Sequence, residues 1–302
     1  MLFGGSKYEE KILNDAFRYA EKNDMRLIYG ALVGGISKGL QNFDSDYDTR
    51  FLYIKNDFPD VIYFPQDHKE SALIKRYYPD EDELYEWIPF WEATSFFQFL
   101  HKPMLDKRLS YGLYGVVLWT MMSPYTWDPY GLQNKIVPYI NSFFNKEYAI
   151  RYYLEQLNNH LTMGNEKEIL IKKYLYALHA ACSLEWVMTY NSMPPVYLKT
   201  LSMGIKNGAV KLEIDKLIES MKKQAEKLDN TNGEMVKLHR SHRSILTQRI
   251  DVVEEYVNNI MILGQKTLKS CVEQEKEEVL SCIQNIYELI KNSLNETKLE
   301  GM

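Results

Sequence analysis

The sequence predicts an α/β (α+β) fold, in which a small mixed β-sheet with helices is followed by an all-helical C-terminal domain. In the first half, short apolar runs alternate with polar loops, which is typical of strands joined by turns and helices. From residue 143 onward, apolar residues recur at helical spacing, and no proline follows Pro195. A chain of 302 residues commonly forms two domains. We therefore expect one domain over residues 1–142 and a helical domain over residues 143–302.

The first predicted element is a helix that begins after Ser6. Ser6 and Glu9 have the spacing of a capping box. The apolar residues of the next turns share one face, namely Ile12, Leu13, Ala16, Phe17 and Ala20. Core strands are then predicted at residues 25–33, 46–55 and 83–90. The stretch between the last two strands contains three prolines and mixed polarity, which indicates an insertion.

Helices are predicted throughout the second domain, at residues 148–161, 166–190, 211–227, 234–262 and 266–294. Few glycines interrupt this pattern, so each helix can run for several turns. A helical domain that follows a sheet domain can close over a substrate cleft.

The segment from residue 27 to residue 48 carries the most specific pattern in the chain. An apolar strand ends at Gly34-Gly35, and glycine allows the backbone to approach a ligand closely or to adopt positive φ. Backbone amides in such a turn suit phosphate. After a polar loop, an alternating segment begins, and its period of two places Asp46 and Asp48 on one face. Two carboxylates are therefore expected side by side.

Neighbouring carboxylates repel each other unless a cation or a shared proton relieves the repulsion. Mg²⁺, or Mn²⁺ in its place, is the predicted cation at Asp46 and Asp48, because such ions prefer oxygen ligands and are often held by one or two carboxylates plus substrate phosphates. Two ions bound to a nucleoside triphosphate can clamp the attacking and leaving groups of an in-line displacement. An isolated Asp-x-Asp would instead be a solvated turn before an edge strand; the preceding strand and glycine turn favour the metal site.

These residues resemble the nucleotidyltransferase superfamily typified by DNA polymerase β. Its signature of an apolar residue, two small residues, a spacer and Asp-x-Asp is matched by Val33-Gly34-Gly35 and Asp46-Tyr47-Asp48. Within the superfamily the chain is most similar to the bacterial YcgL/RlaP type, some members of which are associated with RNA-repair loci, since Gly39-Leu40 and Arg50 also match. Segments at residues 91–103 and 172–186 extend the resemblance, which covers residues 27–200.

The resemblance implies an enzyme that transfers a nucleoside monophosphate from a nucleoside triphosphate, such as ATP, to an acceptor hydroxyl and releases pyrophosphate. Asp46 and Asp48 would hold the metal and act in catalysis. The triphosphate would be contacted by a second group of residues, Gly34, Gly35, Ser37, Lys172 and Lys173. For the two lysines, the alternative is a solvated surface position, as is usual for lysine. The acceptor could be an RNA end, a protein or a small molecule.

Such sites commonly contain a third carboxylate, and two residues are candidates for it here. Glu86 and Glu92 share one face of the predicted strand at residues 83–90 and beyond, although Pro89 interrupts the ladder. The alternative is that Glu86 lies on the surface and that Glu92 begins the next helix, where its charge favours the positive end.

Two departures from the family pattern weaken the expected chemistry. Ile36 and His179 occupy positions where many relatives carry arginine, and both changes remove a phosphate contact. An alternative function is therefore a nucleotide-binding or partner-binding protein that has kept the fold with weakened catalysis. A toxin-like transferase that modifies tRNA or a protein is a third hypothesis.

Composition narrows the choice of partners and compartment. The formal net charge of −5 argues against non-specific coating of long nucleic acids, although a local basic patch is compatible with it. The three cysteines lack the spacing of a zinc site and are expected to be reduced. Neither a signal sequence nor a membrane span is evident, so we expect a cytoplasmic protein without a membrane partner.

Overall fold

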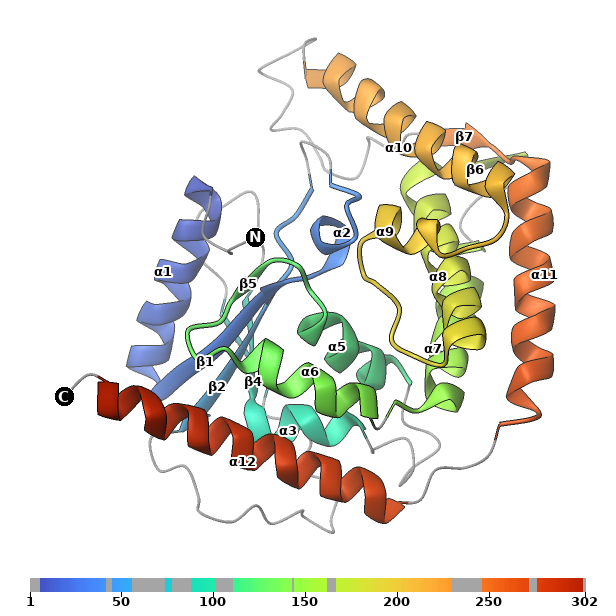
Figure 1. Cartoon of the computed structure of the whole chain (residues 1–302). Coiled ribbons are helices and arrows are strands. Elements are labelled where there is room, and N and C mark those ends of the chain that lie inside the picture. Colours follow the sequence, from blue (N-terminus) through green and yellow to red (C-terminus); the bar gives the residue numbers. More distant parts are fainter. Residues whose placement is uncertain are drawn as a thin grey trace. The chain divides into compact units, whose positions relative to one another are not determined.

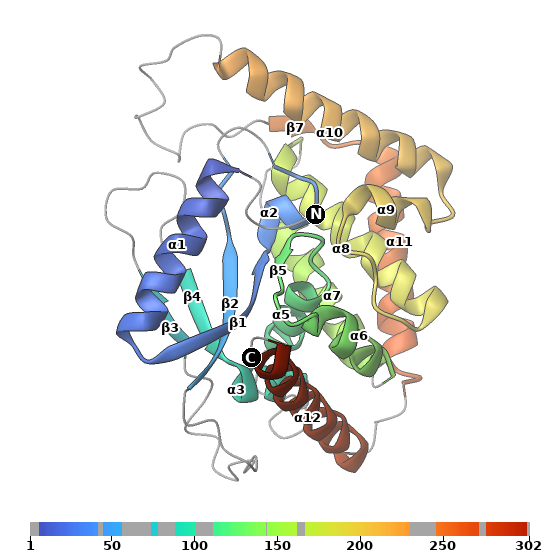
Figure 2. The same ribbon diagram turned by 60° about the vertical axis from the view of Figure 1, so that its left-hand side comes forward.

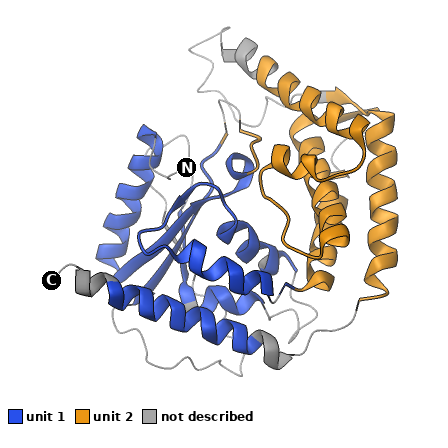
Figure 3. Ribbon diagram, viewed as in Figure 1, with its two compact units in different colours: residues 1–37, 46–144, 274–302 blue, residues 38–45, 145–273 orange. Residues whose placement is uncertain are grey.

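The computed structural model describes nine stretches of the chain, residues 6–41, 45–55, 74–77, 88–100, 111–142, 144–161, 167–229, 246–271 and 276–300 (Figure 1). The chain divides into two compact units (Figure 3). Unit 1 comprises residues 1–37, 46–144 and 274–302, and unit 2 comprises residues 38–45 and 145–273. The passage from unit 1 to unit 2 lies near the expected boundary at residue 142, whereas the C-terminal segment returns to unit 1.

Unit 1 contains a five-stranded sheet in the order β3-β4-β2-β1-β5 among the described residues. Its strands are β1 (Met25–Leu32), β2 (Thr49–Lys55), β3 (Ile74–Tyr77), β4 (Ile88–Glu92) and β5 (Thr126–Trp127). β2 runs antiparallel to β1 and parallel to β4, while the other two pairs are antiparallel. This mixed sheet confirms the predicted α/β (α+β) class, and its neighbouring strands β1 and β2 are the two that flank the Gly-Gly to Asp-x-Asp segment.

Helix α1 (Lys7–Lys22) covers one face of this sheet (Figure 2). The expected capping box forms: the Ser6 hydroxyl accepts from the Glu9 amide at 3.2 Å, and the Ser6 amide donates to the Glu9 carboxylate at 3.3 Å. The buried stripe of the helix packs with strand residues in one apolar cluster, which includes Ile12, Ala16, Ala20, Phe51, Tyr53 and Phe90. The cap and the stripe together fix both the start of α1 and the face that it turns to the sheet.

The other helices of unit 1 are α2 (Gly34–Ser37), α3 (Ala93–Phe97), α5 (Gly112–Met121), α6 (Leu132–Ser142) and α12 (Lys276–Glu300), with the 3₁₀ turn η1 (Gln98–Leu100). α5 contacts β1, where the Tyr29 hydroxyl donates to the Thr120 carbonyl at 3.1 Å. The C-terminal α12 packs on α6, α3 and η1, and Lys135 on α6 donates to the Ser293 hydroxyl at 2.8 Å. The last helix of the chain therefore belongs to the sheet unit.

Unit 2 is built around helix α8 (Ile171–Tyr190), which is buried on most sides. It contacts α7 (Lys146–Leu161), α9 (Leu198–Met203), α10 (Gly208–Asp229) and α11 (Asp251–Leu268). A short antiparallel pair, β6 (Glu168–Leu170) with β7 (Leu246–Gln248), was not expected from the helical periodicity, because three-residue strands are too short to show alternation. The helical character of this region confirms the prediction.

Candidate functional site

The glycine turn and the second aspartate of the pattern lie in direct contact. After β1 ends, the Val33 amide donates to the Asp48 carbonyl at 2.8 Å, which holds the two segments together. Gly34 has φ of +66°, a conformation that side chains rarely adopt. A Cβ built on Gly34 would lie 2.9 Å from Cγ of Asp48 and would overlap its carboxylate oxygen. The Asp48 carboxylate therefore lies over a position where only glycine fits.

The two aspartates precede the strand instead of lying within it. β2 begins at Thr49, so the expected strand over residues 46–55 is too long by three residues. Asp46 and Asp48 are both exposed, while Tyr47 between them is partly buried against the α1 side of the sheet. Both aspartates are thus exposed to solvent just before β2, and their placement side by side on one face stays a prediction.

Gly35 and Ser37 belong to α2, a single helical turn that begins at Gly34. Both are buried, and the Ser37 hydroxyl donates to the Gly34 carbonyl at 3.1 Å. In this arrangement Ser37 stabilises the turn that carries Gly34. Its lone pairs can accept further hydrogen bonds, but its proton is already in use.

Arg50 on β2 contacts the adjacent helix α5. Its guanidinium donates to the Val116 carbonyl at 3.3 Å and to the Thr120 hydroxyl at 3.1 Å, both on α5. The Thr120 hydroxyl in turn donates to the Val116 carbonyl at 2.7 Å. The match of Arg50 to the family pattern therefore has a structural reason in this chain, because the arginine joins β2 to α5.

Glu92 does not lie with the two aspartates. It pairs in parallel register with Tyr53, five residues beyond Asp48, which corresponds to about 16 Å along the strands. Its carboxylate accepts from the Ser95 amide at 2.9 Å and caps α3. Burial, and then the charge of Glu92, raise the pKa of Tyr53 to about 12. The helix-capping alternative is the one that the geometry supports, and the other candidate acid, Glu86, lies outside the described residues.

Lys172 and Lys173 lie on the first turn of α8 in unit 2, and both are partly buried. Lys173 is close to His160 on α7, whose pKa falls to about 4 because of burial and the charges of Lys173 and Lys38. The His160 ring stacks on Tyr176, with ring centroids 5.3 Å apart and planes 21° apart. We call Lys38, His160, Lys173 and Tyr176 the basic cluster.

Lys38 begins the spacer between the Gly-Gly turn and Asp46, and this spacer, residues 38–45, belongs to unit 2. Its ammonium lies 4.6 Å from the centroid of the Tyr176 ring, and its carbonyl accepts from the Leu198 amide at 3.0 Å. The next residue, Gly39, has φ of +74°, and a Cβ there would lie 2.8 Å from Cζ of Tyr197. The Gly39-Leu40 part of the pattern therefore packs against the start of α9 within unit 2. Only glycine fits at its first position, because of the Tyr197 ring and the positive φ.

His179 lies next to this cluster and is buried in α8. Its Nε2 is 2.8 Å from the Val196 carbonyl, and burial together with the charge of Lys38 lowers its pKa to about 3. The ring is therefore neutral near pH 7 and donates Nε2–H to the carbonyl. A neutral histidine does not supply the cation that the family resemblance leads us to expect at this position.

Lys38 and His160 were not singled out by the sequence patterns. They are separated from Tyr176 by 138 and 16 positions, and only the packing of α7, α8 and the spacer brings them together. The one available signal for Lys38 was its place directly before Gly39 in the spacer.

The donor set fits a hard divalent cation in part. Asp46 and Asp48 supply exposed oxygen ligands at the glycine turn, which is the type of ligand that Mg²⁺ prefers. Within the described stretches, no three His, Cys, Asp or Glu side chains come together in a way that could hold a metal. One or two protein carboxylates are a common set for Mg²⁺ when substrate phosphates and waters complete its coordination.

Comparisons with known proteins agree with the sequence pattern. Residues 9–259 match the model of the family described as RlaP, RNA repair pathway DNA polymerase beta family. The uncharacterized protein YcgL of Bacillus subtilis (strain 168) is 19% identical over 295 residues, which cover 97% of this chain and 99% of YcgL. No solved structure matches the chain. Among the helices that the structure describes, none combines the length and the apolar character needed to cross a bilayer.

Proposed function

Since the chain belongs to the RlaP family of DNA polymerase beta-like nucleotidyltransferases, we propose that it transfers a nucleoside monophosphate from a nucleoside triphosphate to an acceptor hydroxyl and releases pyrophosphate. The observation that carries the proposal is the contact between the Asp48 carboxylate and Gly34. This contact joins the turn whose backbone amides would bind phosphate to one of the two carboxylates that would hold the metal.

In this proposal, Asp46 and Asp48 hold Mg²⁺ or Mn²⁺. The bound ion would polarise the phosphoryl oxygens and lower the pKa of the acceptor hydroxyl. Asp48 is held by the backbone bond of Val33 and by its fit over Gly34, so its carboxylate is placed before the substrate arrives. Glu86 remains the proposed third acid, because Glu92 is used as a helix cap at the other end of the strand.

Two kinds of phosphate contact are proposed. The turn at Gly34 and Gly35 offers backbone amides, and Lys172 and Lys173 offer charges that would stabilise the leaving pyrophosphate. Lys38 is a further cation of the basic cluster, and its charge, like that of Lys173, lowers the pKa of His160. An RNA end is the acceptor that we favour, since the family description names RNA repair; a protein, including the target of a toxin-like transferase, or a small molecule are the alternatives.

The test is label transfer by the full-length chain. Each α-labelled nucleoside triphosphate would be incubated with Mg²⁺ or Mn²⁺ and with either an RNA oligonucleotide or a cell extract. We expect Asp46→Asn and Asp48→Asn to lose at least about 100-fold in rate, as removal of one charge-stabilising group commonly does. Asp215→Asn, an exposed carboxylate on α10, is the matched control. Undiminished transfer by Asp48→Asn would exclude this assignment of the site.

A second candidate function is nucleotide binding with weak chemistry. Ile36 lies in the apolar cluster and His179 is neutral, so neither supplies the cation that arginine gives in many relatives. Calorimetry with a triphosphate separates the two functions. Tight binding, with no pyrophosphate release under any tested acceptor, would favour the binding protein.

A further inference from the structure

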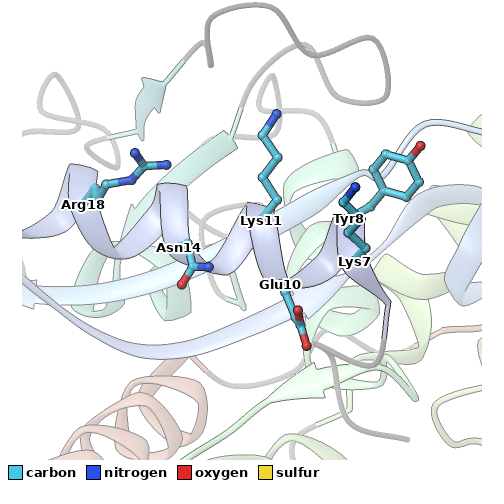
Figure 4. Close-up of a pocket in the computed structure, with 6 residues that line it drawn as sticks. All are labelled: Lys7, Tyr8, Glu10, Lys11, Asn14 and Arg18. Atoms are coloured by element: carbon cyan, nitrogen blue, oxygen red, sulfur yellow. The ribbon is translucent and has the colours of Figure 1, made fainter.

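The exposed side of α1 forms a basic groove in unit 1, the unit that also contains Asp46 and Asp48. The groove has a volume of about 410 Å³ and is lined by Lys7, Tyr8, Glu10, Lys11, Asn14 and Arg18 (Figure 4). Its cations lie at positions i, i+4 and i+11, so they share one face of the helix. Three cations in one groove are notable in a chain whose formal net charge is −5.

The charges of the groove are arranged along one side. Lys11 and Arg18 project from the same side of α1, whereas Glu10 projects from the other (Figure 4). Arg18 pairs with the buried Asp15 one turn earlier, which orients its guanidinium, while its own side chain remains 68% exposed. Along the helix axis Lys7 and Arg18 are about 16 Å apart, a span of about five stacked nucleotides at about 3.4 Å each.

Tyr8 connects this groove to the segment that carries the two aspartates. Its side chain is exposed, and its ring centroid lies 6.0 Å from that of Tyr47, the residue between Asp46 and Asp48. Tyr47 packs on the apolar cluster beneath α1, and this packing holds the Tyr47 ring in place next to Tyr8. An exposed aromatic ring next to a row of cations is the arrangement that binds single-stranded nucleic acid, with bases on the ring and phosphates on the cations.

We propose that the groove on α1 binds the backbone of a single-stranded nucleic-acid acceptor, with Lys7, Lys11 and Arg18 on its phosphates and a base on Tyr8. The strand would then lie next to Tyr47, the residue between Asp46 and Asp48 in the chain. This inference rests on the proposed function, because it takes the acceptor to be a nucleic-acid strand. The inference identifies a surface that would hold the strand. The glycines and aspartates of the sequence pattern do not identify such a surface.

The test is direct binding without nucleotide or divalent metal. Fluorescence anisotropy with a labelled ten-nucleotide RNA, and with the DNA of the same sequence, would be recorded between 50 and 200 mM salt. We expect Lys7→Glu/Lys11→Glu to weaken binding at low salt by more than tenfold. We also expect it to reduce the slope of log K against log salt by about 1.4, since each single-strand phosphate contact contributes about 0.7.

Two further variants make the result specific. Lys199→Glu/Lys266→Glu changes the net charge equally at exposed positions of unit 2 and should keep both the affinity and the slope. Tyr8→Leu should weaken binding about tenfold with an unchanged slope, because it removes stacking and no charge. Thermal unfolding of each variant would confirm that α1 is intact, and a glutamate in the first turn is compatible with the helix dipole.

The outcomes decide the proposal separately from the catalytic one. Loss of binding in the α1 variant but not in the unit 2 variant supports the groove, and comparison of the two oligonucleotides identifies the strand that it prefers. Equal losses in both variants, or no binding by the unmodified chain, would overturn it. Neither result bears on Asp46 and Asp48, because binding is measured without triphosphate and metal.

Discussion

At the scale of single residues, Gly34 is the position on which the candidate site depends most directly. Its positive φ and the carboxylate of Asp48 exclude a side chain for two independent reasons. The sequence could predict this glycine, because the turn and the two aspartates are close in the chain. It could not predict the basic cluster, since Lys38 and Tyr176 meet only through tertiary packing.

The two reasons can be separated by a matched pair of variants. Gly131 has φ of +63°, and a Cβ added there would have no atom within 4 Å, so Gly131→Ala measures the backbone strain alone, about 1 kcal/mol. Gly34→Ala adds the displacement of Asp48, and we expect a total cost of about 2–4 kcal/mol with loss of label transfer. Urea unfolding and transfer assays would measure both. If the two variants lost the same free energy of unfolding and kept the same rate of label transfer, the contact with Asp48 would contribute to neither stability nor activity.

His160 gives a prediction about pH. Its pKa is about 4 in the folded chain and about 6.5 in an unfolded one, so the unfolded state binds the proton more strongly between these values. The stability that a neutral His160 provides is present above pH 6.5 and is lost as the pH falls toward 4. We expect the urea midpoint of the unmodified chain to fall between pH 7 and pH 5.

The variant His160→Gln should show a smaller fall over the same range, because its side chain takes up no proton. His179, with a pKa of about 3, retains its own contribution in that variant, so some acid sensitivity should remain. Lys173→Ala should raise the pKa of His160, as measured by NMR titration. An unchanged pKa would place Lys173 too far from the ring for it to belong to the basic cluster.

At the scale of elements, β4 and α3 explain why the sequence alone does not identify the third acid. Period two puts Glu86 and Glu92 on one face, but it does not say which end of the strand meets the glycine turn. That information comes from the parallel register of β2 and β4, which the sequence does not contain. Likewise, the start of β2 at Thr49 depends on its hydrogen bonds with β1 more than on local alternation.

Substitution of Glu92 tests this reassignment. Glu92→Gln keeps an oxygen that can accept from the Ser95 amide, so we expect label transfer within about threefold of the unmodified chain and little change in stability. Glu92→Ala should cost about 1 kcal/mol through loss of the cap. Transfer rates and urea unfolding would be compared with those of Asp48→Asn. A loss in Glu92→Gln as large as that in Asp48→Asn would restore Glu92 as a catalytic acid.

At the scale of the whole molecule, the order of the chain and the order of its compact units differ. Unit 1 is formed by three separate segments, and its last segment includes helix α12. The helical periodicity of α12 was predictable. An apolar stripe shows that a helix packs on other elements, but it does not show which unit those elements belong to. The division into a catalytic domain at residues 1–142 and a helical domain at residues 143–302 thus remains a prediction about function, and α12 is the segment on which it can be tested.

Ile286 and Ile262 form a matched pair for this test. Both are isoleucines on C-terminal helices, but Ile286 on α12 is fully buried, whereas Ile262 on α11 is 52% exposed. We expect Ile286→Ala to lower the free energy of unfolding by about 2–5 kcal/mol, and Ile262→Ala to change it by less than about 0.5 kcal/mol. Because α12 packs on α6, α3 and η1, the loss should also lower the protection of the amides in β1 and β2 against hydrogen exchange. If a chain ending at residue 273 unfolded with the same midpoint as the full chain and kept those amides protected, α12 would not be part of the fold of unit 1.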